Sequence, residues 1–150
     1  MKVYLAGPWF YGKQGERLSK VESCLDSFPE LEVFSPRRET LVKPDAGENT
    51  RRQAFEANVH HVNTADFVVA LVDDSDKGTL FECGLAYNAN VPILYYSENA
   101  ENGVFNLMLA ESCIKLGYVT NVDSLKERIE TIVKNGLNNV HAKRFKGEIE

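Results

Sequence analysis

Short, nearly continuous apolar runs recur along the chain, separated by longer segments that have a different periodicity. Five such runs predict β-strands: KVYLAG, LEVFSP, ADFVVALV, VPILYY and KLGYVT. Glycine or proline follows several of these runs, and both residues tend to end strands and helices. ADFVVALV is almost wholly apolar, which is typical of a strand that is buried on both faces.

The intervening segments carry apolar residues every three or four positions, which is the spacing of a one-sided helix. We predict helices over residues 13–27, from Thr50 onward, over residues 79–89 and over NVDSLKERIETIVKN, with a short helix or turn at FNLMLAES. Residues 37–48 are polar and include a proline and a glycine, so we expect a loop there. From Gly136 the chain is polar, and the pattern does not choose between an ordered and a loose tail.

This alternation of strands and helices predicts an α/β fold in which a parallel sheet has helices on both faces. The length of 150 residues suits a single domain over residues 1–150. In open sheets of this kind, ligands bind beyond the carboxyl ends of the strands. The rule selects AGPWF after the first strand, DDSDKG after the third, and the segment after VPILYY.

The composition narrows the classes of function. A formal net charge of -5 gives no general attraction to nucleic acid or an anionic membrane. No apolar run reaches the roughly 20 residues that cross a bilayer. Three cysteines, at Cys24, Cys83 and Cys113, have no metal-binding spacing and an odd count. We therefore expect reduced thiols, a cytoplasmic location and a small ligand that is neutral or weakly charged.

Glu82 lies among apolar residues in GTLFECGLAY. Because an unpaired buried carboxylate is costly, two interpretations compete. In the first, Glu82 faces water and only stabilises a helix start, by about 0.3–1 kcal/mol through the helix dipole. In the second, it projects over the carboxyl edge of the sheet as a nucleophile or base. Glu82 shares a helix face with Leu85 and Ala86, which should pack on the sheet, and this favours the second interpretation.

The acidic loop after the third strand contains Asp73, Asp74 and Asp76. These residues are either ordinary turn residues or acceptors for the hydroxyl groups of a sugar. Their spacing does not match a calcium loop and no histidine or cysteine lies in register, so we expect no metal site.

The loop after the first strand, AGPWF, suits a flat ligand. Gly7 allows a ligand to approach the backbone, and Trp9 or Phe10 can stack on a base. A turn with two core aromatic residues explains the segment equally well. It matches neither the dinucleotide-binding nor the triphosphate-binding glycine motif, and we expect no cofactor.

An ordered set of motifs joins these loops: VYLAGPWF, FSPR, NTAD, the segment from Asp76 to Tyr87 with the pattern D-x-G-T-x-x-E-x-G-x-A-Y, and FNLM. In this order and spacing, the chain resembles the nucleoside 2-deoxyribosyltransferase family. The resemblance implies a flavodoxin-like, doubly wound, mainly parallel five-stranded sheet. It also implies the transfer of 2-deoxyribose between nucleobases through a covalent glycosyl-enzyme, as part of nucleotide salvage.

The resemblance assigns catalytic roles residue by residue. Glu82 matches the nucleophile that attacks C1′ of the deoxyribose, Tyr4 a tyrosine that hydrogen-bonds it, and Asp76 an aspartate that holds the sugar hydroxyls. Asn106 matches an asparagine that reaches the sugar, often from a neighbouring subunit. The resemblance therefore implies a homo-oligomer, a dimer or a hexamer.

Other positions match the binding site for deoxynucleosides and free nucleobases. Gly7, Trp9 and Phe10 lie where family members line the base pocket, and Gly78 leaves room for the sugar. Asn58 departs from the commonest pattern, in which an aspartate at this place helps to protonate the leaving base. Asparagine can hydrogen-bond a base edge but cannot donate a proton as an acid.

Three functions stay open at this point. The first is deoxyribosyl transfer between bases; the second is hydrolysis of a deoxynucleoside or its 5′-monophosphate; the third is a non-catalytic nucleotide-binding module. Monophosphate hydrolases of this fold tend to have serine and arginine in the first loop, and AGPWF has neither. A binding module does not need a nucleophile, so the joint presence of Tyr4, Asp76, Glu82 and Asn106 favours an enzyme.

Overall fold

The central feature of the fold is a parallel sheet of five strands. The computed structural model describes residues 1–150, apart from the side chain of Glu101. The strands are β1 (Lys2–Ala6), β2 (Glu32–Phe34), β3 (Phe67–Leu71), β4 (Ile93–Tyr96) and β6 (Tyr118–Val119). Their order in the sheet is β2-β1-β3-β4-β6, which is the flavodoxin-like, doubly wound arrangement. The predicted fold class and all five predicted strands are confirmed.

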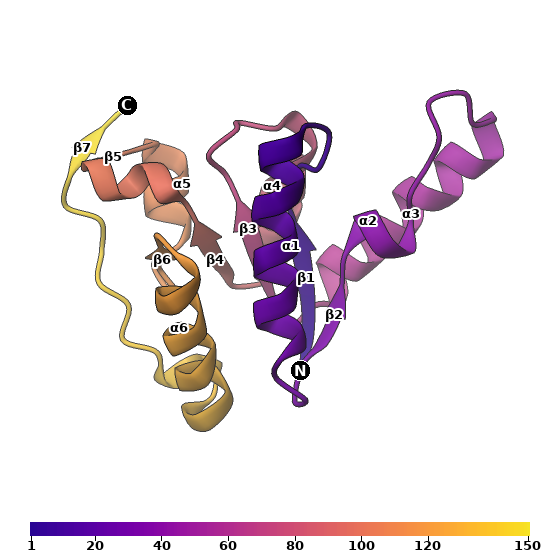
Figure 1. Ribbon diagram of the computed structural model, residues 1–150. Helices are drawn as coiled ribbons and strands as arrows, with labels where there is room; N and C mark the ends of the chain where they lie inside the picture. Colours follow the sequence, from indigo (N-terminus) through magenta and orange to yellow (C-terminus); the bar gives the residue numbers. More distant parts are fainter.

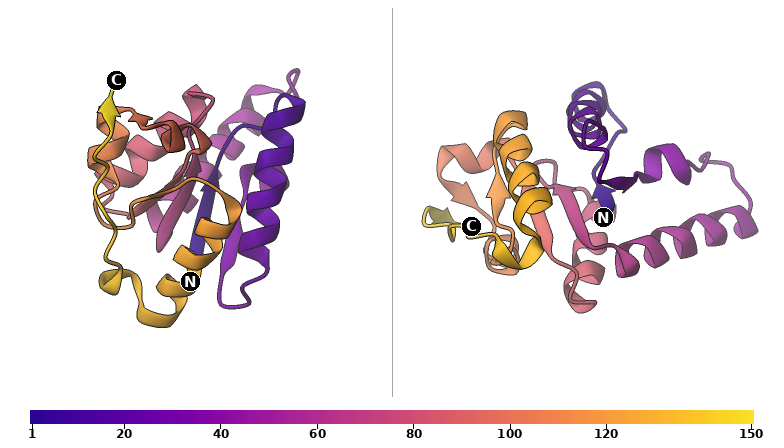
Figure 2. Two further views of the ribbon diagram at one scale, coloured as in Figure 1. Left: turned by 60° about the vertical axis from the view of Figure 1, so that its left-hand side comes forward. Right: turned by 90° about the horizontal axis from the view of Figure 1, so that it is seen from below.

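Helices cover both faces of this sheet (Figure 2). On one face lie α1 (Gly12–Asp26) and α6 (Val122–Asn135), and on the other lie α3 (Glu48–Thr64) and α4 (Lys77–Asn88). The amino-terminal half of α3 extends beyond the β2 edge of the sheet (Figure 1). The shorter elements are α2 (Pro36–Glu39), η1 (Glu98–Asn102), β5 (Val104–Phe105), α5 (Leu107–Ser112) and η2 (Leu137–Asn139).

The sheet separates two hydrophobic clusters, because successive side chains of a strand point to opposite faces. In β1, Val3 and Leu5 pack in the cluster under α1 and α6, whereas Tyr4 and Ala6 pack in the cluster under α3 and α4. All residues of β3 are buried, as its apolar run predicts. The tyrosine of β1 therefore emerges on the face that α4 covers.

The loop predicted over residues 37–48 is partly wrong. Pro36–Glu39 forms the helical turn α2, and α3 begins at Glu48 rather than at Thr50. Buried Glu22 of α1 explains the turn, because its carboxylate accepts a hydrogen bond from Ser35 at 2.7 Å and pairs with Arg37 and Arg38. A segment that looks mainly polar in the sequence is thus anchored to the body of the protein.

The segment after η2 is an ordered tail. Phe145 packs against the rings of Phe105 and Tyr118, with ring centroids 5.6 and 5.5 Å apart. The strand β7 (Glu148–Ile149) then pairs in parallel with β5. A Cβ atom at Gly147 would lie 2.3 Å from the carbonyl oxygen of Gly103, so this crossing requires glycine. In the described part of the chain, no helix has the length and apolar character needed to cross a membrane.

Candidate active site

The centre of the candidate site is a hydrogen bond between β1 and α4. The hydroxyl of Tyr4 donates to Oε1 of Glu82 over 2.6 Å. Tyr4 is fully buried and Glu82 is half-buried. The side chain of Glu82 thus points inward to the sheet, the direction that its helix face predicts.

Burial controls the ionisation of this pair. It raises the pKa of Glu82 to about 7; the hydrogen bond from Tyr4 lowers that pKa and the nearby charge of Asp76 raises it. Burial, and then the charge of Glu82, raises the pKa of Tyr4 far above its ordinary value, so Tyr4 remains a proton donor. The carboxylate of Glu82 therefore titrates near neutral pH beside a hydroxyl that does not.

The second carboxylate oxygen of Glu82 is available to a ligand. Oε2 accepts no hydrogen bond from a described residue. Among the described residues, every buried side-chain nitrogen or oxygen has a hydrogen-bond partner. Oε2 must consequently be open to solvent. Tyr4 holds one oxygen, and the other presents its lone pairs outward.

A column of rings stands behind Tyr4, and the sequence patterns did not identify it. Phe34 of β2 stacks on Tyr4 with centroids 5.6 Å apart, and His61 of α3 stacks on Phe34 at 3.8 Å. Burial lowers the pKa of His61, which favours its neutral form. The column fixes the plane of the Tyr4 ring and so the direction of its hydroxyl. The only signal for it in the sequence is the position of Phe34 at the end of its short strand.

Asp76 has a structural role at the start of α4. Its Oδ2 accepts hydrogen bonds from the backbone nitrogen and the hydroxyl of Thr79, at 2.8 and 2.9 Å, and so caps the helix. A Cβ atom at Gly78 would lie 3.2 Å from the same oxygen, so glycine leaves room for the cap. Neither bond uses Oδ1 of Asp76, which remains an acceptor on the same helix as Glu82.

The remaining aspartates of the acidic loop hold neighbouring segments together, and Asp73 is nearly buried rather than the solvated turn residue of the first interpretation. Asp73 accepts hydrogen bonds from the Ser97 hydroxyl at 2.6 Å and from the next two backbone nitrogens. Arg17 of α1 lies 2.9 Å from Asp74. These bonds join the loops after β3 and β4. No group of three His, Cys, Asp or Glu side chains among the described residues is arranged to hold a metal ion.

The loop after β1 differs from the expectation for Gly7. A Cβ atom there would lie 3.0 Å from Cδ1 of Leu18 and 3.2 Å from Cβ of Leu71, so core packing requires this glycine. Trp9 is half-buried against the core on the α1 side. Its ring stacks on Phe10, with centroids 5.1 Å apart, and Phe10 is 64% exposed. In this loop, Phe10 is the aromatic ring that a ligand can reach.

Asn58 lies on the face of the sheet that α3 and α4 cover, the face on which Tyr4 meets Glu82. It lies on α3, which packs against α4 and β1. Its Oδ1 accepts a hydrogen bond from the hydroxyl of Thr40 over 2.6 Å. Thr40 follows α2 and is a polar partner that the sequence patterns did not select.

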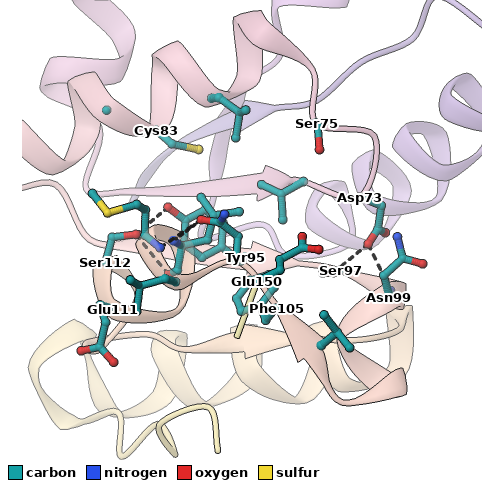
Figure 3. Close-up of a pocket in the computed structure, with 18 of the residues that line it drawn as sticks. Asp73, Ser75, Cys83, Tyr95, Ser97, Asn99, Phe105, Glu111, Ser112 and Glu150 are labelled. Atoms are coloured by element: carbon teal, nitrogen blue, oxygen red, sulfur yellow. Dashed lines mark hydrogen bonds between the residues drawn. The ribbon is translucent and has the colours of Figure 1, made fainter. Parts of the chain in front are cut away.

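A cavity of about 660 Å³ lies beside α4 (Figure 3). The residues that line it from α4 are Leu80, Cys83, Gly84 and Tyr87, which form one stripe of the helix, and Glu82 is not among them. Tyr95 of β4 and Phe105 of β5 form the opposite wall in Figure 3.

Asn106 lines this cavity and caps α5 through its Oδ1, which accepts from the backbone nitrogen of Met108 at 3.0 Å. A single chain therefore brings Tyr4, Asp76 and Glu82 together but keeps Asn106 on the other side of α4.

Comparison with known proteins identifies the family of the chain. The sequence profile described as nucleoside 2-deoxyribosyltransferase matches residues 3–129. The chain belongs to the nucleoside 2-deoxyribosyltransferase family. The predicted resemblance is therefore confirmed, and the chain is assigned to a family of glycosyl-transfer enzymes. A sequence comparison with curated proteins finds no match.

Solved structures of similar fold include members of this family. A 2-deoxyribosyltransferase from Bacillus psychrosaccharolyticus has a TM-score of 0.71 and 27% identity, with 84% of this chain and 90% of that chain covered. A 2-deoxyribosyltransferase from Leishmania mexicana has a TM-score of 0.54 at 19% identity, with 89% and 97% covered. A CMP N-glycosidase from Clostridium botulinum has a TM-score of 0.60 at 15% identity, with 87% and 98% covered. The last two likenesses show the fold alone.

Proposed function

We propose that the protein transfers 2-deoxyribose between nucleobases, with Glu82 as the nucleophile. The observation that carries the proposal is the Tyr4–Glu82 hydrogen bond in a chain of this family. Transfer through an oxocarbenium-like transition state needs a carboxylate on one face of the sugar. Oε2 of Glu82 is open to solvent while Oε1 is held, so the carboxylate is oriented for attack.

The reaction proceeds in two displacements at C1′. Oε2 of Glu82 forms a bond to C1′, the bond from C1′ to the base nitrogen breaks, and the base leaves with that electron pair and takes up a proton. A nitrogen of the second base then attacks C1′, loses its proton and releases the Glu82 carboxylate. Forming the ester divides one difficult step into two easier ones.

The remaining residues hold the substrate. Asp76 accepts hydrogen bonds from the sugar hydroxyls through its Oδ1, and Gly78 leaves room beside it. Phe10 offers stacking surface to the base, with Trp9 stacked behind it, and Asn58 offers its amide. No resident cofactor takes part in this scheme, and the substrates are deoxynucleosides and free bases. Reactions of this type recycle deoxynucleosides in the cytoplasm, where thiols such as Cys83 stay reduced.

The active form is a homo-oligomer in which Asn106 completes the site of a neighbouring copy. Asn106 and Glu82 lie on different sides of α4 within one chain, which supports delivery of Asn106 from outside. Exposed apolar side chains surround Asn106, including Leu107 and Met108, which are 50% and 75% exposed. Burial of these side chains against a second copy would stabilise a dimer or a hexamer.

One assay tests the proposal. The protein is incubated with deoxyinosine and free adenine or cytosine, and the products are separated by chromatography. A new deoxynucleoside supports deoxyribosyl transfer. Free hypoxanthine without a new nucleoside would instead indicate hydrolysis, since water can resolve the same intermediate. Binding in calorimetry without any turnover would indicate a nucleotide-binding module and contradict the proposal.

A further inference from the structure

On α3, Asn58 lies between two residues that pack near Glu82 and Tyr4. Three residues before it on α3, the ring of Phe55 contacts that of Phe81, the neighbour of Glu82, with centroids 6.2 Å apart. Four residues after it, Val62 is fully buried in the cluster that contains Tyr4. Residues three and four apart share one face of a helix. The side chain of Asn58 therefore leaves α3 on the face that packs towards α4 and the cluster of Tyr4.

The orientation of the Asn58 amide follows from its contact with Thr40. The distance of 2.6 Å between Oγ1 of Thr40 and Oδ1 of Asn58 suits a hydroxyl that donates to a carbonyl oxygen. It is shorter than the roughly 2.9–3.0 Å that is usual when nitrogen donates. The same hydroxyl lies 3.3 Å from the carbonyl oxygen of Pro36, but its single proton is best placed on the nearer acceptor. Thr40 therefore donates to Asn58, and the amide oxygen of Asn58 is turned towards it.

Thr40 is itself held in place by the buried network around α2. Its backbone nitrogen donates to the carbonyl oxygen of Pro36 at 3.0 Å. The preceding turn is anchored by Glu22, which pairs with Arg37 and Arg38. This anchoring explains how a residue at the start of a loop can fix an amide on a neighbouring helix.

We propose that Thr40 is a positioning residue that makes Asn58 a hydrogen-bond donor to the base. With Oδ1 facing Thr40, the two N–H groups of Nδ2 remain, and neither bonds to another described residue. The site then selects bases that present an acceptor, a carbonyl oxygen rather than an amino group, at the edge that faces Asn58. This inference rests on the proposed deoxyribosyl transfer and adds a substrate class to it.

The test compares Thr40→Val, which loses the hydroxyl, with Thr40→Ser, which keeps it. Thr64→Val is the matched control, because within the described part of the chain the Thr64 hydroxyl bonds only to the carbonyl of His60 on its own helix, at 2.8 Å. For each variant, kcat/KM is measured with hypoxanthine and with adenine as the accepting base. These two purines differ in having a carbonyl oxygen or an amino group at one position.

In the wild-type protein we expect a preference for hypoxanthine. Thr40→Val should reduce the ratio of the two kcat/KM values about tenfold, as expected when one oriented hydrogen bond is lost. Thr40→Ser should restore the ratio, and Thr64→Val should leave it unchanged. A ratio that stays within about twofold in Thr40→Val, or that falls equally in Thr64→Val, would overturn the inference.

A binding measurement separates this inference from the proposed function. The affinities of deoxyinosine and deoxyadenosine are measured by calorimetry for Thr40→Val and the wild-type protein, without turnover. A preference for deoxyinosine that Thr40→Val abolishes supports the inference even if no exchange activity is found. Equal affinities in the wild-type protein, or no binding of either nucleoside, would overturn it even if exchange occurs.

Discussion

The hydroxyl of Tyr4 lies 2.6 Å from Oε1 of Glu82, and two further rings, those of Phe34 and His61, are stacked behind the Tyr4 ring. This contact joins the first strand of the sheet to the helix after its third strand. Because Tyr4 is fully buried, its hydroxyl cannot move without disturbing the core. The position of the Glu82 carboxylate is therefore set by the packing of the sheet.

Replacement of Glu82 tests the nucleophile. Glu82→Ala should reduce exchange by at least about a thousandfold, since a covalent route is lost with its nucleophile. The measurement is chromatographic assay of base exchange, with mass spectrometry of acid-quenched wild-type protein to detect deoxyribose on the Glu82 peptide. Thermal unfolding should show that the fold is kept. Exchange near the wild-type rate in Glu82→Ala would refute the central assignment.

Replacement of Tyr4 by Phe should shift the pH dependence of the reaction. Removal of the hydrogen bond removes the contribution that lowers the pKa of Glu82, so this pKa should rise above about 7. Because attack needs the anion, the acid limb of the profile of kcat/KM against pH should move to higher pH. Tyr96→Phe is a matched control, since the Tyr96 hydroxyl bonds to Glu98 at 3.1 Å, outside the site. An acid limb that does not move in Tyr4→Phe would contradict this account.

The raised pKa of Glu82 should also appear in the stability of the protein. The native pKa is about 7 and the ordinary value is 4.5, so the native state binds the proton more tightly than the unfolded state. The stabilisation is complete below pH 4.5 and is lost as pH rises through about 7, with a magnitude on the order of 3 kcal/mol. Denaturant unfolding of the wild-type protein and Glu82→Gln across this range measures it. A difference between the two proteins that is independent of pH would argue against the shift.

Asp76 allows capping to be separated from sugar binding. Asp76→Ala removes the cap on Thr79 and should destabilise the protein by about 1 kcal/mol, whereas Asp76→Asn keeps a good capping residue and should cost only a few tenths. Both substitutions remove the carboxylate and should raise the KM for the deoxynucleoside. The two readouts are urea unfolding and steady-state kinetics. Full substrate affinity in Asp76→Asn would remove Asp76 from the binding site.

Mixing two inactive variants tests the origin of Asn106. Asn106→Ser keeps a side chain that can cap α5 but removes the amide. Glu82→Ala and Asn106→Ser should each be inactive alone. An equal mixture should recover about a quarter of wild-type activity if the protein is a dimer whose subunits exchange at random. A mixture that stays inactive after subunit exchange would show that Asn106 acts within its own chain or does not act at all.

The sequence predicted the sheet well because local patterns determine it. The apolar runs identify each strand, and the alternation with helices identifies a parallel sheet. The direction of Glu82 was also predictable, since it follows from the helix period and from the apolar neighbours Leu85 and Ala86. Phe145 was overlooked because a single aromatic residue in a polar tail forms no pattern, although it packs on two rings.

The contacts that refine the site were not predictable, since they join segments far apart in the sequence. Thr40 meets Asn58 only because Glu22 draws the turn after β2 towards α1. Gly7 suggested close approach by a ligand, but Leu18 and Leu71 occupy the space where its side chain would be. A glycine marks close approach without identifying the group that approaches, and only the packed structure distinguishes a ligand from a neighbouring helix.

The stacked pair of Trp9 and Phe10 allows ligand binding to be followed by intrinsic tryptophan fluorescence. Trp9 is the single tryptophan of the chain, and it is half-buried in the loop that follows β1. Its only ring partner among the described residues is Phe10, which is largely exposed. A base that stacks in this loop would change the surroundings of one indole, so intrinsic fluorescence reports occupancy from a single position and needs no label.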